Sequence, residues 1–257
     1  MKRNGFTLVE LSIVLVIIGL LVGGIMAGQS LIRNAELATV TAEIDKFKKA
    51  TVQFREQYQA LPGDMSDATN YWGAQHATPA TCATTASTSA LTCNGDGNGL
   101  VNVATGAHET FRYWQHLANA GFIEGRFNGV SGNLANTLGA SPDNSPRARV
   151  ENNGVWWIWS WGINPAGFAT GNYNNVIEVG GLNGAAGSYL EPSIGILTIE
   201  EQWNIDTKID DGFATNGKVV TRSWPACSNA TSDSDTGGTY DLLDRTTLCA
   251  LLFRQQF

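Results

Sequence analysis

The first 60 of the 257 residues divide into two stretches with different patterns of apolar and polar positions. No charged residue occurs from Leu11 to Ile32, and this largely apolar run is long enough to cross a hydrocarbon core of roughly 30 Å as a helix. Beyond it, apolar residues recur at steps of three and four, the period of one helix face. These positions are Leu37, Val40, Ile44, Phe47, Phe54, Tyr58 and Leu61, with Thr51 filling one gap.

Both stretches fit a single helix. The first proline is Pro62, and nothing between Phe6 and this proline breaks a helix strongly. We therefore predict one helix from Phe6 to about Tyr58, roughly 80 Å long at a rise of 1.5 Å per residue, with Pro62-Gly63 as its end. Its first half is apolar all round. Its second half has one apolar stripe, which we expect to pack on the rest of the chain.

The remaining residues, 61–257, carry shorter patterns of both kinds. We expect an amphipathic helix over 108–123, strands over 155–163, 174–182 and 217–224, and a helix over 199–211 that begins at a Thr198–Glu201 capping box and stops at Gly212. Segments 74–92 and 128–154 are predicted loops, and a helix is one interpretation of the apolar run 242–253. The fold class is α+β: a long N-terminal helix packed against a C-terminal globular head with an antiparallel sheet.

Composition favours an exported, loop-rich surface protein over a cytosolic enzyme. Hydrophobic residues make up 43% of the chain and charged residues 15%, with 29 glycines. The formal net charge is −7, and no cluster of Lys and Arg follows the first residues. Nonspecific binding to a phosphate backbone needs such a cluster, so we expect no nucleic-acid partner.

The four cysteines are Cys82, Cys93, Cys227 and Cys249. An even number in an exported chain predicts two disulfides, and four cysteines allow three pairings. The local pairing, Cys82–Cys93 with Cys227–Cys249, is favoured because each bridge closes a short loop. Four reduced thiols in a cytosolic protein are the alternative, and the N-terminus argues against it.

The start of the chain indicates membrane insertion. Lys2 and Arg3 precede the apolar run, which places the N-terminus on the cytoplasmic side. A cleaved secretory signal is a poor fit, because the apolar region would contain Glu10 and the best cleavage point, after Ala27, has Ile25 where a small residue is usual. A carboxylate at the centre of a bilayer costs roughly 2.5–3.5 kcal/mol, so Glu10 requires an explanation.

The segment "KRNGFTLVELSIVLVIIGLL" resembles the N-terminus of type IV pilin-like proteins: pilins, minor pilins and type II secretion pseudopilins. The resemblance covers about residues 2–32, and the long helix extends it to about residue 60. It implies a leader peptide (1–5), a transmembrane and assembly helix (6–30), an amphipathic stalk helix (31–60) and a periplasmic or extracellular head (61–257). The head carries no motif of equal strength.

The resemblance also implies a sequence of events. A prepilin peptidase would cut between Gly5 and Phe6 and N-methylate the new terminus at Phe6. The precursor would sit in a bacterial inner membrane, in contact with lipid, with its head periplasmic. An inner-membrane assembly platform would then add it to other pilin or pseudopilin subunits in a pilus or pseudopilus. Glu10 would become the fifth residue of the mature chain, the position that these families use in assembly.

Physical chemistry supports that role for Glu10. Cleavage creates an α-amino group at Phe6, which is mostly protonated near neutral pH. A buried amine needs a counter-charge, and burying the pair costs far less than burying either charge alone. Glu10 lies one helical turn away and could pair with its own terminus or with that of a neighbouring subunit. The alternative is a polar residue tolerated at the membrane edge.

The segment "CNGDGNGL", residues 93–100, is the candidate metal site of the head. Oxygen-bearing side chains alternate at Asn94, Asp96 and Asn98, and Leu100 could add a backbone carbonyl, which matches the start of a calcium loop. The first position is Asn where Asp is usual, and the twelfth, Thr105, is not Glu, so a remote carboxylate such as Glu109, Asp210 or Asp211 would be needed. A glycine-rich turn held by Cys93 is the alternative; calcium is the sole candidate cofactor.

Other features carry less information. The acidic end of the predicted helix, "DTKIDDG" at 206–212, is either a solvated helix end, a cation site or a subunit contact. A tryptophan cluster could line a glycan platform, although such clusters more often form core; its members are Trp156, Trp157, Trp159 and Trp161. No nucleophile–His–Asp pattern and no acid–base pair is recognisable, so we expect no enzyme activity.

These observations predict a structural subunit of a type IV pilus-like filament or secretion pseudopilus. A mature chain that starts at Phe6 is larger than most major pilins, which favours a minor subunit. The alternative is a monomeric membrane-anchored surface adhesin that binds glycans through a Trp-rich face.

Overall fold

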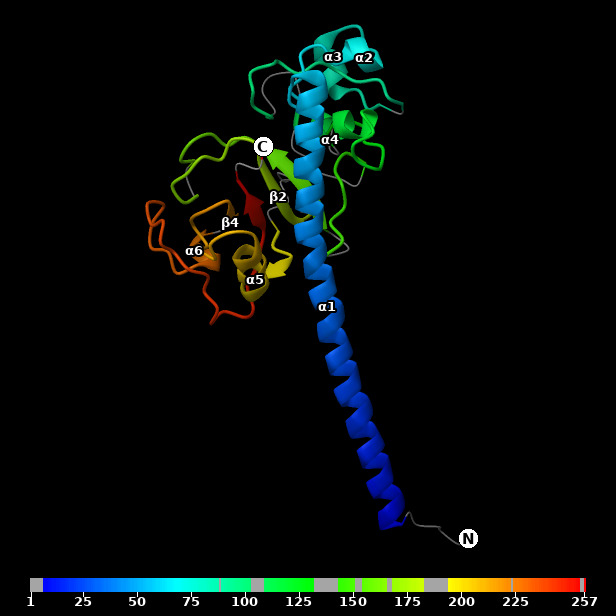
Figure 1. Ribbon diagram of the computed structural model, residues 1–257, viewed down its shortest axis with the longest axis vertical. Coiled ribbons are helices and arrows are strands. Elements are labelled where there is room, and N and C mark those ends of the chain that lie inside the picture. The colour runs from blue at the N-terminus through cyan, green and yellow to red at the C-terminus, as the bar shows by residue number, and fades with distance from the viewer. Residues whose placement is uncertain are drawn as a thin grey trace.

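The computed structural model describes residues 7–87, 89–102, 109–131, 143–150, 154–165, 168–182, 194–222, 224–254 and 257. One helix, α1 (Leu8–Tyr58), runs along most of the molecule, and the head lies beside its C-terminal half and extends past its end at α2 and α3 (Figure 1). The predicted single helix and the α+β fold with an antiparallel sheet are thereby confirmed. The helix ends before Pro62 because Gln59 adopts a left-handed conformation, with φ of 54°.

The head contains five further helices and six strands among the described residues. The helices are α2 (Thr69–Trp72), α3 (Pro79–Thr84), α4 (Glu109–Asn119), α5 (Ile199–Ile209) and α6 (Trp224–Cys227). The strands are β1 (Gly154–Trp159), β2 (Val176–Gly181), β3 (Leu197–Thr198), β4 (Val219–Thr221), β5 (Leu248–Cys249) and β6 (Leu251–Phe253). Four strands form one antiparallel sheet in the order β1-β2-β6-β4, and β3 pairs with β5.

The apolar stripe of α1 forms one side of the main core. Its buried residues are Leu37, Val40, Ile44, Phe47, Ala50, Thr51 and Phe54, so the predicted period is confirmed over these turns. Phe47 makes edge contacts with Trp114 of α4, at 4.9 Å between ring centroids, and with Trp156 of β1, at 5.3 Å. The stalk, a helix and the sheet therefore share one hydrophobic core.

Polar contacts fix the position of the head along α1. The Arg33 guanidinium pairs with Glu201 at 2.6 Å and donates to the carbonyls of Val150 and Ile196. Further along the helix, the Glu43 carboxylate accepts a 2.9 Å hydrogen bond from the Trp156 indole. The head therefore reaches along α1 as far as Arg33, and the large hydrophobic side chains before it, from Leu8 to Ile32, are exposed.

Three predictions about local structure need correction. The segment 242–253 is not helical, because β6 lies between β2 and β4 and pairs with both. The periodicity of a short apolar run does not distinguish a buried strand from a helix. Pairing with the neighbouring strands therefore determines the conformation of this segment. The predicted loop 74–92 contains helix α3, which starts with Pro79 in its first turn, where proline is favoured. The strand predicted over 155–163 also ends earlier, at Trp159.

Candidate functional site

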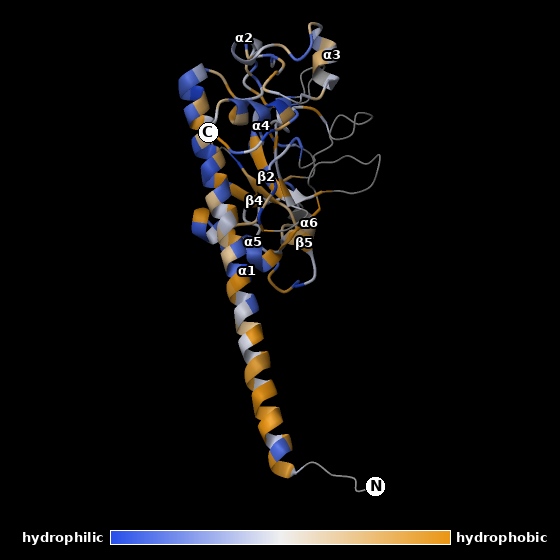
Figure 2. Cartoon of the chain, turned by 90° about the vertical axis from the view of Figure 1, so that its right-hand side faces the viewer, coloured by the Kyte–Doolittle hydropathy of each residue, from blue (hydrophilic) through white to orange (hydrophobic). Residues whose placement is uncertain are grey.

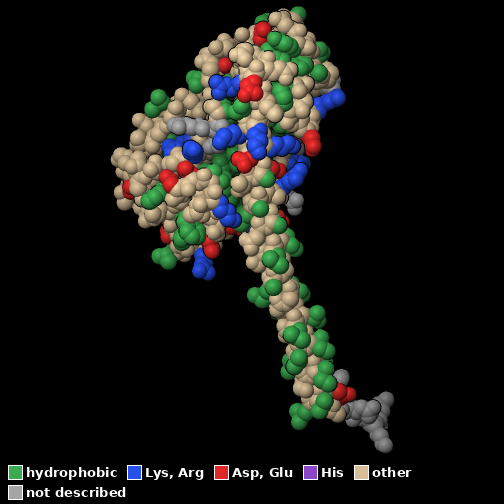
Figure 3. Space-filling view, in the orientation of Figure 1, with side chains coloured by type: hydrophobic (Ala, Val, Ile, Leu, Met, Phe, Trp, Pro, Cys, Tyr) green, Lys and Arg blue, Asp and Glu red, His purple; other side chains and the backbone are tan. Residues whose placement is uncertain are grey.

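The N-terminal half of α1 has the features of an interaction surface. Among the described residues, α1 is long and apolar enough to cross a membrane, and its most apolar stretch is wholly unburied. Large hydrophobic side chains are exposed from Leu8, at 88%, to Ile32. Figure 2 shows this half as mostly hydrophobic, and in Figure 3 the Lys and Arg side chains lie on the head and on the C-terminal half of α1. Such a surface is stable only when lipid or other apolar helices cover it.

Glu10 lies at the first turn of this helix. Thr7 is the N-cap: its hydroxyl accepts a 3.2 Å hydrogen bond from the Glu10 amide, and the Glu10 carboxylate accepts from the Thr7 amide and hydroxyl, both at 2.8 Å. This reciprocal pattern is a capping box, which sequence reasoning missed although Thr7 and Glu10 have the required spacing. Both bonds end on Oε2, and no described residue donates to Oε1. Gly5 and Phe6 lie outside the described residues.

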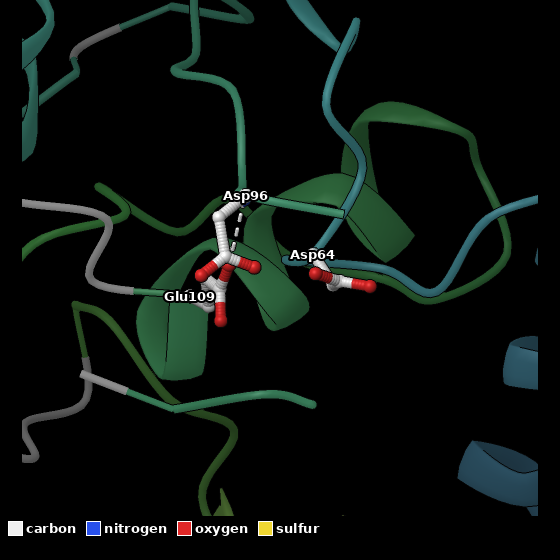
Figure 4. Close-up of side chains that lie close together, drawn as sticks. All are labelled: Asp64, Asp96 and Glu109. Carbon is white, nitrogen blue, oxygen red and sulfur yellow. Dashed lines mark hydrogen bonds between the residues drawn. The ribbon is translucent and has the colours of Figure 1, made fainter. Parts of the chain in front are cut away.

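The candidate calcium loop is held against two carboxylates from other segments. Asp64, Asp96 and Glu109 each place an oxygen within 4.8 Å of the others (Figure 4). Glu109 was anticipated as a remote carboxylate and lies at the start of α4, next to Asp96. Asp64 was not anticipated: it follows the turn after α1, and only the tertiary structure brings it to the loop.

Backbone amides of the loop donate hydrogen bonds to the carboxylates of Asp64 and Glu109. Asp64 accepts hydrogen bonds from the Asn98 and Gly99 amides, both at 2.9 Å. Glu109 accepts from the Asp96 amide at 2.9 Å and from the Asn102 amide at 3.1 Å. All four oxygens of Asp64 and Glu109 therefore already accept an N–H donor, as a structural turn requires.

The predicted oxygen ligands within the loop have partners as well. Asn94 accepts from the Thr69 amide at 2.8 Å, and Asn98 accepts from the Leu100 amide at 2.7 Å. Asp96 accepts from the Asn98 amide and the Asn98 side chain. Calcium binding by Asn94, Asp96, Asn98 and Leu100 stays a prediction, and the turn with satisfied hydrogen bonds is its alternative.

Burial and repulsion between the carboxylates raise pKa values in the group formed by Asp64, Asp96 and Glu109. The pKa of Glu109 is raised to about 8, mainly by burial and also by the charges of Asp96 and Asp64, against the opposing effect of the donated amides. Burial also raises the pKa of Asp64. Near neutral pH Glu109 is therefore largely protonated in the absence of a cation.

Asp210 and Asp211 form a separate acidic group with Asp206 at the end of α5. The pKa of Asp206 is raised to about 7, mainly by burial and also by the charges of Asp211 and Asp210. The hydrogen bond from the Tyr240 hydroxyl acts in the opposite direction and lowers this pKa. Asp210 and Asp211 therefore lie with Asp206 and not with the loop at 93–100, whose neighbouring carboxylates are Asp64 and Glu109.

The tryptophan cluster is largely core. Trp156 and Trp157 are fully buried, as the core interpretation predicts. Trp159 and Trp161 are half-buried, and the Arg222 guanidinium lies 5.2 Å from the Trp161 ring centroid. A glycan platform would have to rely on these last two rings. The cysteines pair as Cys82–Cys93 and Cys227–Cys249, which confirms the local pairing.

Comparison with known proteins identifies one segment. The prokaryotic N-terminal methylation motif matches residues 1–26. Neither a curated protein nor a solved structure matches the chain. The match includes Glu10 and most of the exposed apolar helix, and it does not extend to the head.

Proposed function

Because the chain begins with a type IV pilin-like prepilin segment, we propose that it becomes a structural subunit of a type IV pilus-like filament or secretion pseudopilus. The motif implies processing by a prepilin peptidase and assembly with other pilin subunits. The proposal rests above all on the N-terminal half of α1, which exposes apolar side chains on every face and carries one charge, that of Glu10. Lipid would cover this surface before assembly, and neighbouring helices would cover it afterwards.

We place the precursor in a bacterial inner membrane. Lys2 and Arg3 lie before the apolar run and favour a cytoplasmic N-terminus, so the head would lie in the periplasm. The two disulfides fit this oxidising compartment. The size of the head favours a minor subunit, and the absence of a recognisable catalytic constellation in the sequence favours a structural role over an enzymatic one.

Glu10 has a specific part in this proposal. Once Gly5 and Phe6 are separated, the amine at Phe6 needs a counter-charge in an apolar surrounding. The Thr7 cap occupies Oε2 of Glu10 and leaves Oε1 without a donor among the described residues. A neighbouring subunit could offer its protonated amine to Oε1, and this pairing would fix the axial register of the two helices.

Mass spectrometry of the mature N-terminus tests the proposal. The full chain is produced in a bacterium with a prepilin peptidase and isolated from the membrane. We expect a chain that starts at Phe6 and is heavier by one methyl group. An intact Met1, or a start at Gly28 after signal-peptide cleavage, would contradict the filament assignment.

A further inference from the structure

Three aspartates gather where α5 ends. Asp206 lies in the last turn, Asp210 is the C-cap and Asp211 follows it. One carboxylate oxygen from each lies within 4.8 Å of the others. No Lys, Arg or His of the described residues forms an ion pair with any of the three. Their negative charge is therefore uncompensated within the described structure.

Each carboxylate is held by one hydrogen bond. The Tyr240 hydroxyl donates to Oδ2 of Asp206 at 3.1 Å. The Lys218 amide donates to Oδ2 of Asp210, and the Phe213 amide donates to Oδ1 of Asp211 at 2.9 Å. Among the described residues, no hydrogen bond reaches the second oxygen of any of these side chains.

The second carboxylate oxygen of Asp206 lacks the partner that a buried polar atom requires. The side chain is fully buried, and its Oδ1 is inaccessible to water and has no hydrogen-bond partner. A buried polar atom without a partner costs about 1–3 kcal/mol, and more when it is charged. The acidic group at residues 64, 96 and 109 differs, because hydrogen bonds reach both oxygens of each of its carboxylates.

We propose that Asp206, Asp210 and Asp211 bind a calcium ion. Calcium takes oxygen ligands at about 2.3–2.6 Å, so oxygens on opposite sides of the ion lie up to about 5 Å apart. The observed separations, within 4.8 Å, match this spacing. Magnesium needs ligands at about 2.0–2.1 Å and retains its water, which suits this partly buried group less well. The negative end of the α5 dipole adds to the attraction for a cation.

The backbone around the group leaves no space for a larger residue. A Cβ at Gly217 would lie 1.9 Å from Oδ2 of Asp210 and 2.8 Å from Oδ2 of Asp211. Gly217 also has a φ of 77°, which disfavours other residues. The ion would therefore tie the end of α5, which packs on the stalk, to the turn that leads into β4.

Isothermal titration calorimetry tests the site. The full chain is purified in a non-ionic detergent, stripped with a chelator and titrated with calcium chloride. We expect the wild type to bind calcium. We expect Asp206→Asn to bind it at least about tenfold more weakly than the wild type. Asp211→Asn changes an exposed side chain and is expected to weaken binding without affecting the fold, which far-UV circular dichroism monitors. Magnesium at the same concentration should compete poorly.

Asp96→Asn is the matched control, because it alters the other acidic group. We expect its calcium affinity to equal that of the wild type. The assignment is overturned if the wild type binds no calcium at millimolar concentration. It is also overturned if Asp96→Asn loses binding while Asp206→Asn and Asp211→Asn retain it, because the ion would then lie in the loop at 93–100. None of these results depends on filament assembly.

Discussion

At the scale of single residues, Glu10 combines two roles that variants can separate. Its carboxylate caps the first turn of α1 through Thr7, and its charge is the one that the exposed apolar helix carries. The cap needs a side chain that accepts a hydrogen bond, which glutamine also provides. The proposed pairing with an amine needs a negative charge, which glutamine lacks.

We therefore expect Glu10→Gln and Glu10→Ala to fail equally in assembly. Both variants should be cut and methylated normally, and both should be depleted from sheared filaments relative to the wild type. Immunoblotting of the filament and membrane fractions measures this distribution. Ser12→Ala, which alters an exposed hydroxyl on the same helix, should assemble normally. Normal assembly of Glu10→Gln would mean that the cap, and not the charge, is what assembly requires.

His116 is the residue for which the structure predicts the clearest pH effect. Its ring is buried, accepts a 3.0 Å hydrogen bond from the Gly63 amide and lies 2.9 Å from the Thr92 hydroxyl. The pKa of His116 is lowered to about 3, mainly by burial and also by the nearby Arg112 charge. An unfolded histidine has a pKa of about 6.5. Between pH 6.5 and 3 the unfolded state therefore binds more protons, and stability falls as the pH falls.

We expect His116 alone to lower the free energy of unfolding by about 2 kcal/mol between pH 6.5 and 5. Glu109 and Asp206 act in the opposite direction, because their raised pKa values make the folded state take up protons. The effect is therefore read from the difference between the wild type and His116→Gln. Urea unfolding followed by tryptophan fluorescence at both pH values measures it. Parallel pH profiles for the two proteins would show that His116 does not titrate in this way.

At the scale of elements, α1 joins the head through one face of its C-terminal half. Phe47 lies at the centre of this contact, between Trp114 and Trp156. We expect Phe47→Ala to lower the free energy of unfolding by about 3–5 kcal/mol, because it leaves a cavity in the core. Val52→Ala, at a position on the same helix that is 39% exposed, should cost less than about 1 kcal/mol. Urea unfolding measures both, and equal losses would contradict the assigned contact face.

The elements also differ in how well local sequence patterns predict them. The period of three and four from Leu37 to Phe54 predicts the buried face of α1, because a long helix repeats the signal over many turns. The capping box at Thr198 and Glu201 likewise predicts the start of α5, and the structure confirms it. The apolar run at 248–253 is too short for such a period, so its conformation depends on the strands that flank it.

At the scale of the whole molecule, two disulfides stabilise separate parts of the head. Cys82–Cys93 closes a loop of 11 residues and Cys227–Cys249 one of 22. Each bridge restricts the unfolded chain, an effect of about 3 kcal/mol for loops of this size. We expect replacement of either pair by alanine to lower the free energy of unfolding by about this amount. A reducing agent should destabilise the wild type and leave the variant that lacks both bridges unchanged; a wild type that does not respond would contradict the pairing.

The sequence by itself determined the features that depend on local or long-repeating signals. These are the processing motif, the membrane-length apolar helix, the buried stripe of α1, the α+β fold class and the local disulfide pairing. Each is encoded in neighbouring residues or in a period sustained over many turns. The tertiary structure alone decided which distant carboxylates meet. Asp64 lies close to Glu109 and the loop at 93–100 because the packing of α1 and α4 sets these separations, and no local pattern records them.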